Sequence, residues 1–145
     1  MNRLPLFVYG TLRDPDIIGA VLGRALKDGQ ARAATAPGYG AVHMPGRVYP
    51  GLVRRPGDAA PGLVLSGLSS EDHDVLDAFE GEEYRRQRIM VICGPKSLSA
   101  EAYLPVEAIA GDTPAWTLEA WTRLHKSAVL AKDSRTTSEQ GEEPT

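Results

Sequence analysis

Glu80 combines a side chain able to transfer protons with an unusual place in the sequence. It follows Leu76 by four residues and His73 by seven, so a continuous helix would put it on the apolar side, where an ionised carboxylate is costly. It also falls at the expected end of that helix beside Glu82 and Glu83, where the helix dipole and like charges disfavour negative charge. These effects raise a carboxyl pKa, and a carboxyl titrating near neutral pH can act as general acid and base. The alternative is a frayed helix end with Glu80 in water.

A second candidate feature is the loop Tyr9 to Leu12, which ends a short apolar run near the N-terminus. A loop that leads from a strand into a helix exposes main-chain N–H groups, and glycine there allows a ligand to approach the backbone closely. Such a loop can bind a carboxylate or stabilise a developing oxyanion. The alternative is an ordinary strand-to-helix turn.

Arginines and tyrosines offer further candidates for ligand contact. A guanidinium matches a carboxylate with two parallel hydrogen bonds. The candidates for that role are Arg54, Arg55, Arg85, Arg86 and Arg88. Strand alternation places Tyr84, Arg86 and Arg88 on one face and Arg85 on the other, and either face could meet a pocket. Three tyrosines, Tyr9, Tyr49 and Tyr84, are candidates for pocket walls, with simple packing as the alternative.

The residue patterns of several other enzyme classes are absent from the sequence. The histidines at 43, 73 and 125 are scattered singly and the chain has one cysteine, Cys93, so we expect neither a metal site nor a disulfide. Cys93 continues an alternating strand pattern, which favours packing over a nucleophilic role. No glycine-rich nucleotide-binding motif and no serine nucleophile motif occurs, which disfavours nucleotide cofactors and serine hydrolysis.

Composition excludes further classes of function. The net charge of -3, without a long basic run, disfavours nucleic acid and anionic lipid as partners. No apolar stretch reaches the ~18 residues that a membrane span needs, and the N-terminal apolar run is broken by Pro5, unlike a secretory signal. Because a single cysteine also suits a reducing compartment, we expect a soluble cytoplasmic protein.

Local patterns in the first half of the chain predict the elements that hold the candidate loop. The apolar run 6–9 predicts a buried strand. Asp14 can cap a helix with Pro15 at its first position, and helical spacing of apolar residues continues to Gly29. The segment 31–66 is rich in glycine and proline and predicts short strands and hairpins.

The second half predicts two more helices around two strands. Ser69 or Ser70 can cap a helix that runs to Glu80, with Gly81 at its C-terminus. Its predicted apolar stripe is Val75, Leu76 and Phe79. Strands are expected at 84–93 and 100–104, and a third helix is expected to open at Thr113-Pro114. The apolar face of this helix would contain Leu118, Trp121, Leu124 and Ala128, and both Trp116 and Trp121 are interpreted as core residues.

These elements indicate an α+β fold in one domain. The tail 133–145 has no large apolar residue, so we expect a domain over residues 1–132 followed by a disordered tail. No oligomeric state is predicted.

Two segments, LFVYGTL at 6–12 and LDAFEGEEYRR at 76–86, together resemble the γ-glutamylcyclotransferase family in sequence, order and separation. The segments 48–52 and 62–68 are similar to middle strands of this family and extend the likeness over about residues 4–104. The form Tyr-Gly-Thr-Leu is similar to that of the γ-glutamylamine cyclotransferases and the avirulence-induced-gene-like proteins. The resemblance implies a small mixed β-barrel flanked by helices, a cavity between the first loop and Glu80, and no cofactor.

The resemblance also implies a reaction and a site. A γ-glutamyl amine or peptide would close on itself, releasing 5-oxoproline and a free amine, so no nucleophilic side chain is needed. The implied site has Glu80 as general acid/base and Tyr9, Gly10, Thr11, Leu12, Tyr49 and Tyr84 as substrate-binding residues. Two alternatives stand beside this expectation. One is a non-catalytic module that binds a small metabolite in the same cavity, and the other is an interaction protein with an exposed Glu80 and a closed cavity.

Overall fold

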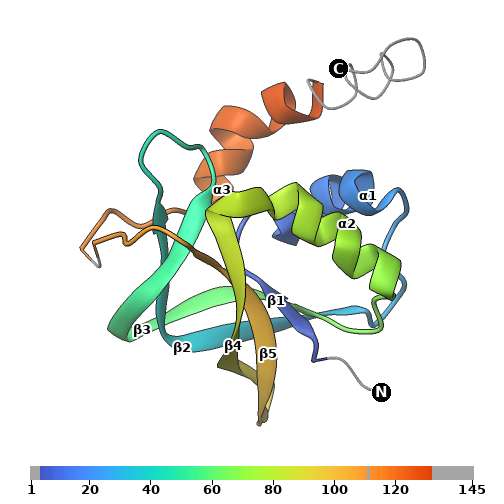
Figure 1. Cartoon of the computed structure of the whole chain (residues 1–145), viewed down its shortest axis with the longest axis horizontal. Helices are drawn as coiled ribbons and strands as arrows, with labels where there is room; N and C mark the ends of the chain where they lie inside the picture. The colour runs from blue at the N-terminus through green and yellow to red at the C-terminus, as the bar shows by residue number, and fades with distance from the viewer. Residues whose placement is uncertain (1–3, 111, 132–145) are drawn as a thin grey trace.

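The computed structural model describes residues 4–110 and 112–131. Five strands form a closed barrel in the order β1-β3-β2-β4-β5. The strands are β1 (Leu6–Val8), β2 (Ala31–His43), β3 (Pro50–Leu65), β4 (Tyr84–Cys93) and β5 (Lys96–Pro105). The helices are α1 (Pro15–Leu22), α2 (Ser70–Glu80) and α3 (Leu118–Trp121). In Figure 1, α1 and α2 lie side by side along the barrel and α3 lies at one end of it. The α+β fold with a small barrel and flanking helices is therefore confirmed.

The hairpin of β2 and β3 is much longer than the short strands predicted for this segment. Its register shifts between Pro37 and Tyr39, where Gly38 has a φ of 81°. Such an irregularity bends a strand and lets a long hairpin follow a barrel wall. Gly62 also has a packing role, because a Cβ atom there would lie 2.3 Å from the carbonyl oxygen of Val8. Most glycines and prolines of this segment therefore lie within β2 and β3 instead of ending short strands.

Strand β1 is buried on both faces. Phe7 belongs to the core inside the barrel, whereas Leu6 and Val8 belong to a second core beneath the helices. A strand covered on both sides needs a continuous apolar run, as the sequence of β1 shows. Cys93 is a free thiol buried in the barrel core, in agreement with its predicted packing role. Trp116 and Trp121 are buried in the second core, as predicted.

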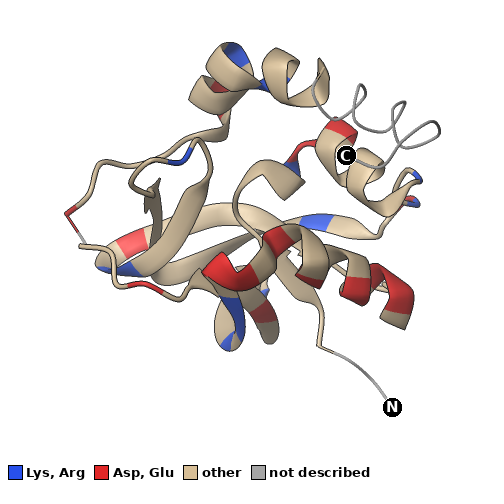
Figure 2. Ribbon diagram, turned by 45° about the horizontal axis from the view of Figure 1, so that its top comes forward, with Lys and Arg blue, Asp and Glu red and all other residues tan. Residues whose placement is uncertain are grey.

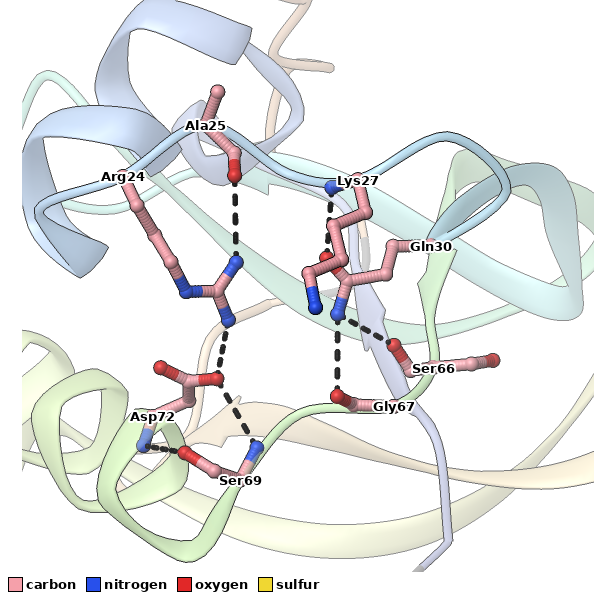
Figure 3. Close-up of polar contacts among 8 residues, drawn as sticks. All are labelled: Arg24, Ala25, Lys27, Gln30, Ser66, Gly67, Ser69 and Asp72. Atoms are coloured by element: carbon pink, nitrogen blue, oxygen red, sulfur yellow. Dashed lines mark hydrogen bonds and ion pairs between the residues drawn. The ribbon is translucent and has the colours of Figure 1, made fainter.

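Helix α1 begins as predicted but ends earlier. Its first turn is capped by Asp14, whose carboxylate accepts hydrogen bonds from the N–H groups of Asp16 and Ile17. The predicted continuation to Gly29 is wrong, because Gly23 adopts a left-handed conformation with a φ of 76° and closes the helix. The chain beyond is tied to the end of β3 by Gln30, whose amide nitrogen donates to the carbonyls of Ser66 and Gly67 (Figure 3).

Helix α2 has the predicted bounds, because its two ends are set by local signals. Ser69 and Asp72 form a capping box, and Arg24 binds the Asp72 carboxylate at 2.5 Å (Figure 3). At the other end, Gly81 has a φ of 71° and ends the helix directly after Glu80. This cap and the Arg24 ion pair fix the first turn of α2 beside α1.

The predicted apolar stripe of α2 is only partly correct. Leu76 is fully buried, but Val75 and Phe79 are 42% and 46% exposed. The inner face of the helix is formed instead by His73 and Leu76, at the spacing that continues to Glu80. Helix α2 therefore turns Glu80 toward the barrel.

The third helix begins at Leu118, four residues after the predicted start. The segment before it pairs with β2 instead, through a bridge between Val42 and Ala115 and a hydrogen bond from Trp116 N–H to the carbonyl of Ala41. Leu124, expected on the apolar face, is 63% exposed. The predicted tail 133–145 lies outside the described residues. None of the described helices has the length and apolar character needed to cross a membrane.

Candidate active site

A cavity of about 180 Å³ lies where the loop after β1, the start of β3, the start of β4 and the end of α2 meet. The structure brings all seven predicted site residues into its lining. These are Tyr9, Gly10, Thr11, Leu12, Tyr49, Glu80 and Tyr84. The lining also contains residues that were not predicted as site residues, among them Phe79, Glu83 and Tyr103. An open cavity with Glu80 in its wall differs from the closed cavity and exposed Glu80 of the interaction-protein alternative.

Glu80 is half-buried at the last position of α2. Burial, and secondly the negative charge of Glu83, raise the pKa of the Glu80 carboxyl from 4.5 to about 7. Among the described residues, none donates a hydrogen bond or forms an ion pair with this carboxylate. The expected direction of the pKa shift is therefore found, with Glu83 rather than Glu82 as its charged neighbour. A carboxyl with this pKa is close to half ionised at neutral pH and can both take and give a proton.

The loop after β1 lines the cavity and contains main-chain N–H groups without an acceptor among the described residues. Residues Thr11–Arg13 form a single 3₁₀ turn, in which Arg13 N–H donates to Gly10 and Asp14 N–H donates to Thr11. The first N–H groups of a helical turn have no partner within it. In the described part of the chain, the N–H groups of Gly10, Thr11 and Leu12 have no hydrogen-bond acceptor. They are therefore free to donate to an anionic ligand.

Gly10 allows this loop to lie against the start of β3. A Cβ atom at position 10 would approach Cγ of Pro50 to 3.0 Å, a tight contact that the proline ring could relieve only by moving. Pro50 itself lines the cavity. The absence of a side chain at Gly10 thus allows two lining residues, Gly10 and Pro50, to lie close together.

Two tyrosines form fixed walls of the cavity. The hydroxyl of Tyr9 donates to the carbonyl of Tyr103 at 2.5 Å, and that of Tyr84 donates to the carbonyl of Pro50 at 2.7 Å. Burial raises the pKa of both hydroxyls above the ordinary range, so both are neutral at physiological pH. Because each hydroxyl donates to a main-chain carbonyl, the two rings are held in place and form part of the cavity wall.

A polar cluster lies at the rim of the cavity. Arg47 Nε donates to Glu83 Oε2 at 2.5 Å, and a second nitrogen of the same guanidinium pairs with this oxygen. The hydroxyl of Tyr49 donates to Glu83 Oε1 at 2.6 Å. These hydrogen bonds lower the pKa of Glu83, so its carboxylate is ionised at neutral pH. Sequence reasoning missed Arg47, because the loop between β2 and β3 carries no local signal for this contact.

The predicted arginines do not line the cavity. Arg86 instead binds Asp77 at 2.7 Å and Glu101 at 2.8 Å, and it donates to the Tyr103 hydroxyl at 3.1 Å. The same guanidinium lies 2.7 Å from Nδ1 of His73. Because Asp77 and His73 belong to α2, these contacts join the helix to β4 and β5. Arg86 therefore holds the helix that carries Glu80.

Acidic residues gather along α2 and the turn after it, as the red segments of Figure 2 show. Despite this concentration, the described residues contain no group of three or more His, Cys, Asp or Glu side chains arranged to hold a metal ion.

Comparison with known proteins identifies relatives over most of the chain. The family model described as gamma-glutamyl cyclotransferase, AIG2-like matches residues 6–123. AIG2-like protein A of Arabidopsis thaliana is 34% identical over 128 residues, which cover 86% of this chain and 76% of the relative. AIG2-like protein D of the same plant is 32% identical over 129 residues, covering 86% and 83% of the two chains.

Solved structures agree with the barrel architecture. A protein of Arabidopsis thaliana solved in solution superposes with a TM-score of 0.66 at 29% identity, covering 98% of this chain and 95% of that chain. A structure named gamma-glutamyl cyclotransferase superposes with a TM-score of 0.58 over 72% of this chain and 67% of the other. Its 16% identity shows a shared fold alone. The match over residues 6–123 confirms the family that the two motifs resembled, and the chain belongs to the γ-glutamyl cyclotransferase, AIG2-like family.

Proposed function

We propose that this protein is a cyclotransferase that releases 5-oxoproline and a free amine from a γ-glutamyl amine or γ-glutamyl peptide. The observation that carries the proposal is the half-buried carboxyl of Glu80, with a pKa of about 7, in the wall of a small cavity. Gly10, Thr11 and Leu12 line the same cavity, and their main-chain N–H groups have no acceptor among the described residues. The cavity thus combines a proton carrier with donors for a developing negative charge.

The reaction needs no nucleophile from the protein, because the substrate carries its own. The α-amino nitrogen attacks the γ-carbonyl carbon, a carbon–nitrogen bond closes the five-membered ring, and the original amide bond then breaks. Glu80 takes the proton that the attacking nitrogen loses and returns it to the departing amine. The protein's task is to hold the curled substrate, and correct orientation in intramolecular reactions is worth up to about 7–11 kcal/mol.

The loop of Gly10, Thr11 and Leu12 would bind either the substrate carboxylate or the oxyanion formed at the γ-carbonyl. Loss of one such donor typically costs about 10²–10³ in turnover in enzymes that use them. The cavity of about 180 Å³ is smaller than the ~300–1,000 Å³ typical of sites for drug-sized ligands. It therefore suits the γ-glutamyl group, with the amine extending toward the rim.

A panel of γ-glutamyl amines and dipeptides tests this function directly. The purified protein should release 5-oxoproline and the free amine in equal amounts from at least one member. If a γ-glutamyl compound raises the melting temperature but no compound in the panel releases 5-oxoproline, the protein is a binding module and the proposal is wrong.

A further inference from the structure

Glu83 lines the cavity but has no role in the reaction proposed above. It ends the single 3₁₀ turn that follows α2, three residues after Glu80, and it lines the same cavity. Both of its carboxylate oxygens accept hydrogen bonds, from Arg47 on one side and Tyr49 on the other. A surface glutamate without such partners would be free to turn into water. This one is held at the rim.

Apart from Glu83, the titratable groups that line the cavity with Glu80 carry no charge at neutral pH. They come from the loop after β1, the segment just before β3, the start of β4 and the end of β5. These groups are the hydroxyls of Tyr9, Tyr49, Tyr84 and Tyr103. Their pKa values all lie above the ordinary tyrosine value, with burial as the leading cause. No lysine, arginine or histidine is among the described residues that line the cavity. Glu83 is thus the one lining residue, apart from Glu80, that is charged at neutral pH.

We propose that Glu83 is a positioning residue for the acid/base step, because Arg47 and Tyr49 hold its carboxylate in the wall of the cavity that also contains Glu80. The catalytic meaning of this inference rests on the proposed function, but the electrostatic effect does not require it and can be tested without substrate. Arg47 and Tyr49 keep Glu83 ionised, and a fixed negative charge makes a neighbouring carboxyl hold its proton more tightly. Glu80 can then protonate a leaving amine near neutral pH.

The variant Glu83→Gln separates charge from shape. Glutamine keeps the size of the side chain and an oxygen that Tyr49 or Arg47 can still donate to. We expect the pKa of Glu80 to fall in this variant. It should stay above the ordinary glutamate value, because burial, the larger cause of the shift, remains.

Carbon-13 NMR of the glutamate side-chain carboxyls measures this pKa without any substrate, and the spectrum of Glu80→Gln identifies the Glu80 signal. Glu82→Gln is the matched control, because Glu82 is an exposed neighbour outside the cavity lining. We expect a lower Glu80 midpoint in Glu83→Gln and an unchanged midpoint in Glu82→Gln. If the two variants give the same Glu80 midpoint, the inference is overturned.

Arg47→Gln distinguishes the charge of Glu83 from the arrangement of its loop. Tyr49 still binds Glu83 in this variant and Glu83 remains ionised at neutral pH, so the pKa of Glu80 should not fall. If the pKa of Glu80 falls as far in Arg47→Gln as in Glu83→Gln, the arrangement of the segment around Glu83, and not its charge, causes the effect. The inference would then be wrong.

Turnover provides a second readout. The low-pH limb of kcat/KM should move to lower pH in Glu83→Gln but not in Glu82→Gln, and a limb that does not move contradicts the inference. If no γ-glutamyl compound is turned over, the proposed function fails, while the NMR titration still decides the role of Glu83.

Discussion

Replacing Glu80 with glutamine should change the pH dependence of stability by an amount that follows from its burial. The pKa of Glu80 is about 7 in the folded protein and near 4.5 when the side chain is solvated. The folded state therefore holds this proton more tightly than the unfolded state. The contribution of the protonated carboxyl to stability is present at low pH and is lost as pH rises through about 7.

Linkage gives the size of this effect. A shift of this extent makes folding about 3 kcal/mol less favourable at pH 8, and the cost falls below ~1 kcal/mol at pH 5. In the variant Glu80→Gln this dependence disappears, since an amide does not titrate. The free energy of unfolding of the variant relative to the native sequence should therefore rise by about 2–3 kcal/mol between pH 5 and pH 8.

Urea unfolding of both proteins at the two pH values measures this difference. Taking the difference between pH values removes any constant cost of placing an amide in the cavity wall. A relative stability that stays the same within ~0.5 kcal/mol would show that Glu80 is solvated and would refute the reasoning on its pKa. The expected gain in stability on losing Glu80 is the behaviour of a functional residue kept at a cost to folding.

Three further substitutions test the scaffold around the site. Arg86→Met removes the group that joins α2 to β4 and β5, and unfolding measurements should show a loss of about 3 kcal/mol together with reduced turnover. Gly62→Ala places a methyl group 2.3 Å from the carbonyl oxygen of Val8, so a loss above ~2 kcal/mol is expected in the same assay, and a neutral result would contradict the close approach of β1. Ser69→Ala removes the side chain that caps α2 and should cost about 1 kcal/mol, whereas Ser70→Ala, one residue later, should cost much less.

Elements with local signals could be predicted from the sequence. Helix α2 runs between Ser69 and Gly81 as expected, because a capping box and a glycine with a positive φ each act within one turn. Six of the seven predicted site residues belong to the two family motifs, Tyr49 belongs to the segment 48–52, and all seven line one cavity. The inward turn of Glu80 follows from its spacing from Leu76 and His73, two buried residues of α2.

Features that depend on distant contacts could not be predicted in this way. The chain before α3 does not form a helix, because Trp116 and its neighbours pair with the backbone of β2. Phe79 matches the helical apolar pattern but faces the cavity and solvent, since the barrel selects which side of α2 is buried. The pairing of Arg47 with Glu83 joins residues 36 positions apart, and no sequence pattern in either segment predicts it.

The most direct test of the central claim compares turnover of the native protein and Glu80→Gln on the best γ-glutamyl substrate, with 5-oxoproline as the measured product. Glutamine fills the same space but cannot cycle a proton, so turnover should fall by at least ~100-fold while circular dichroism shows the same fold. Glu82→Gln should retain native turnover as the matched control. Full activity of Glu80→Gln would contradict the claim that Glu80 is the acid/base catalyst.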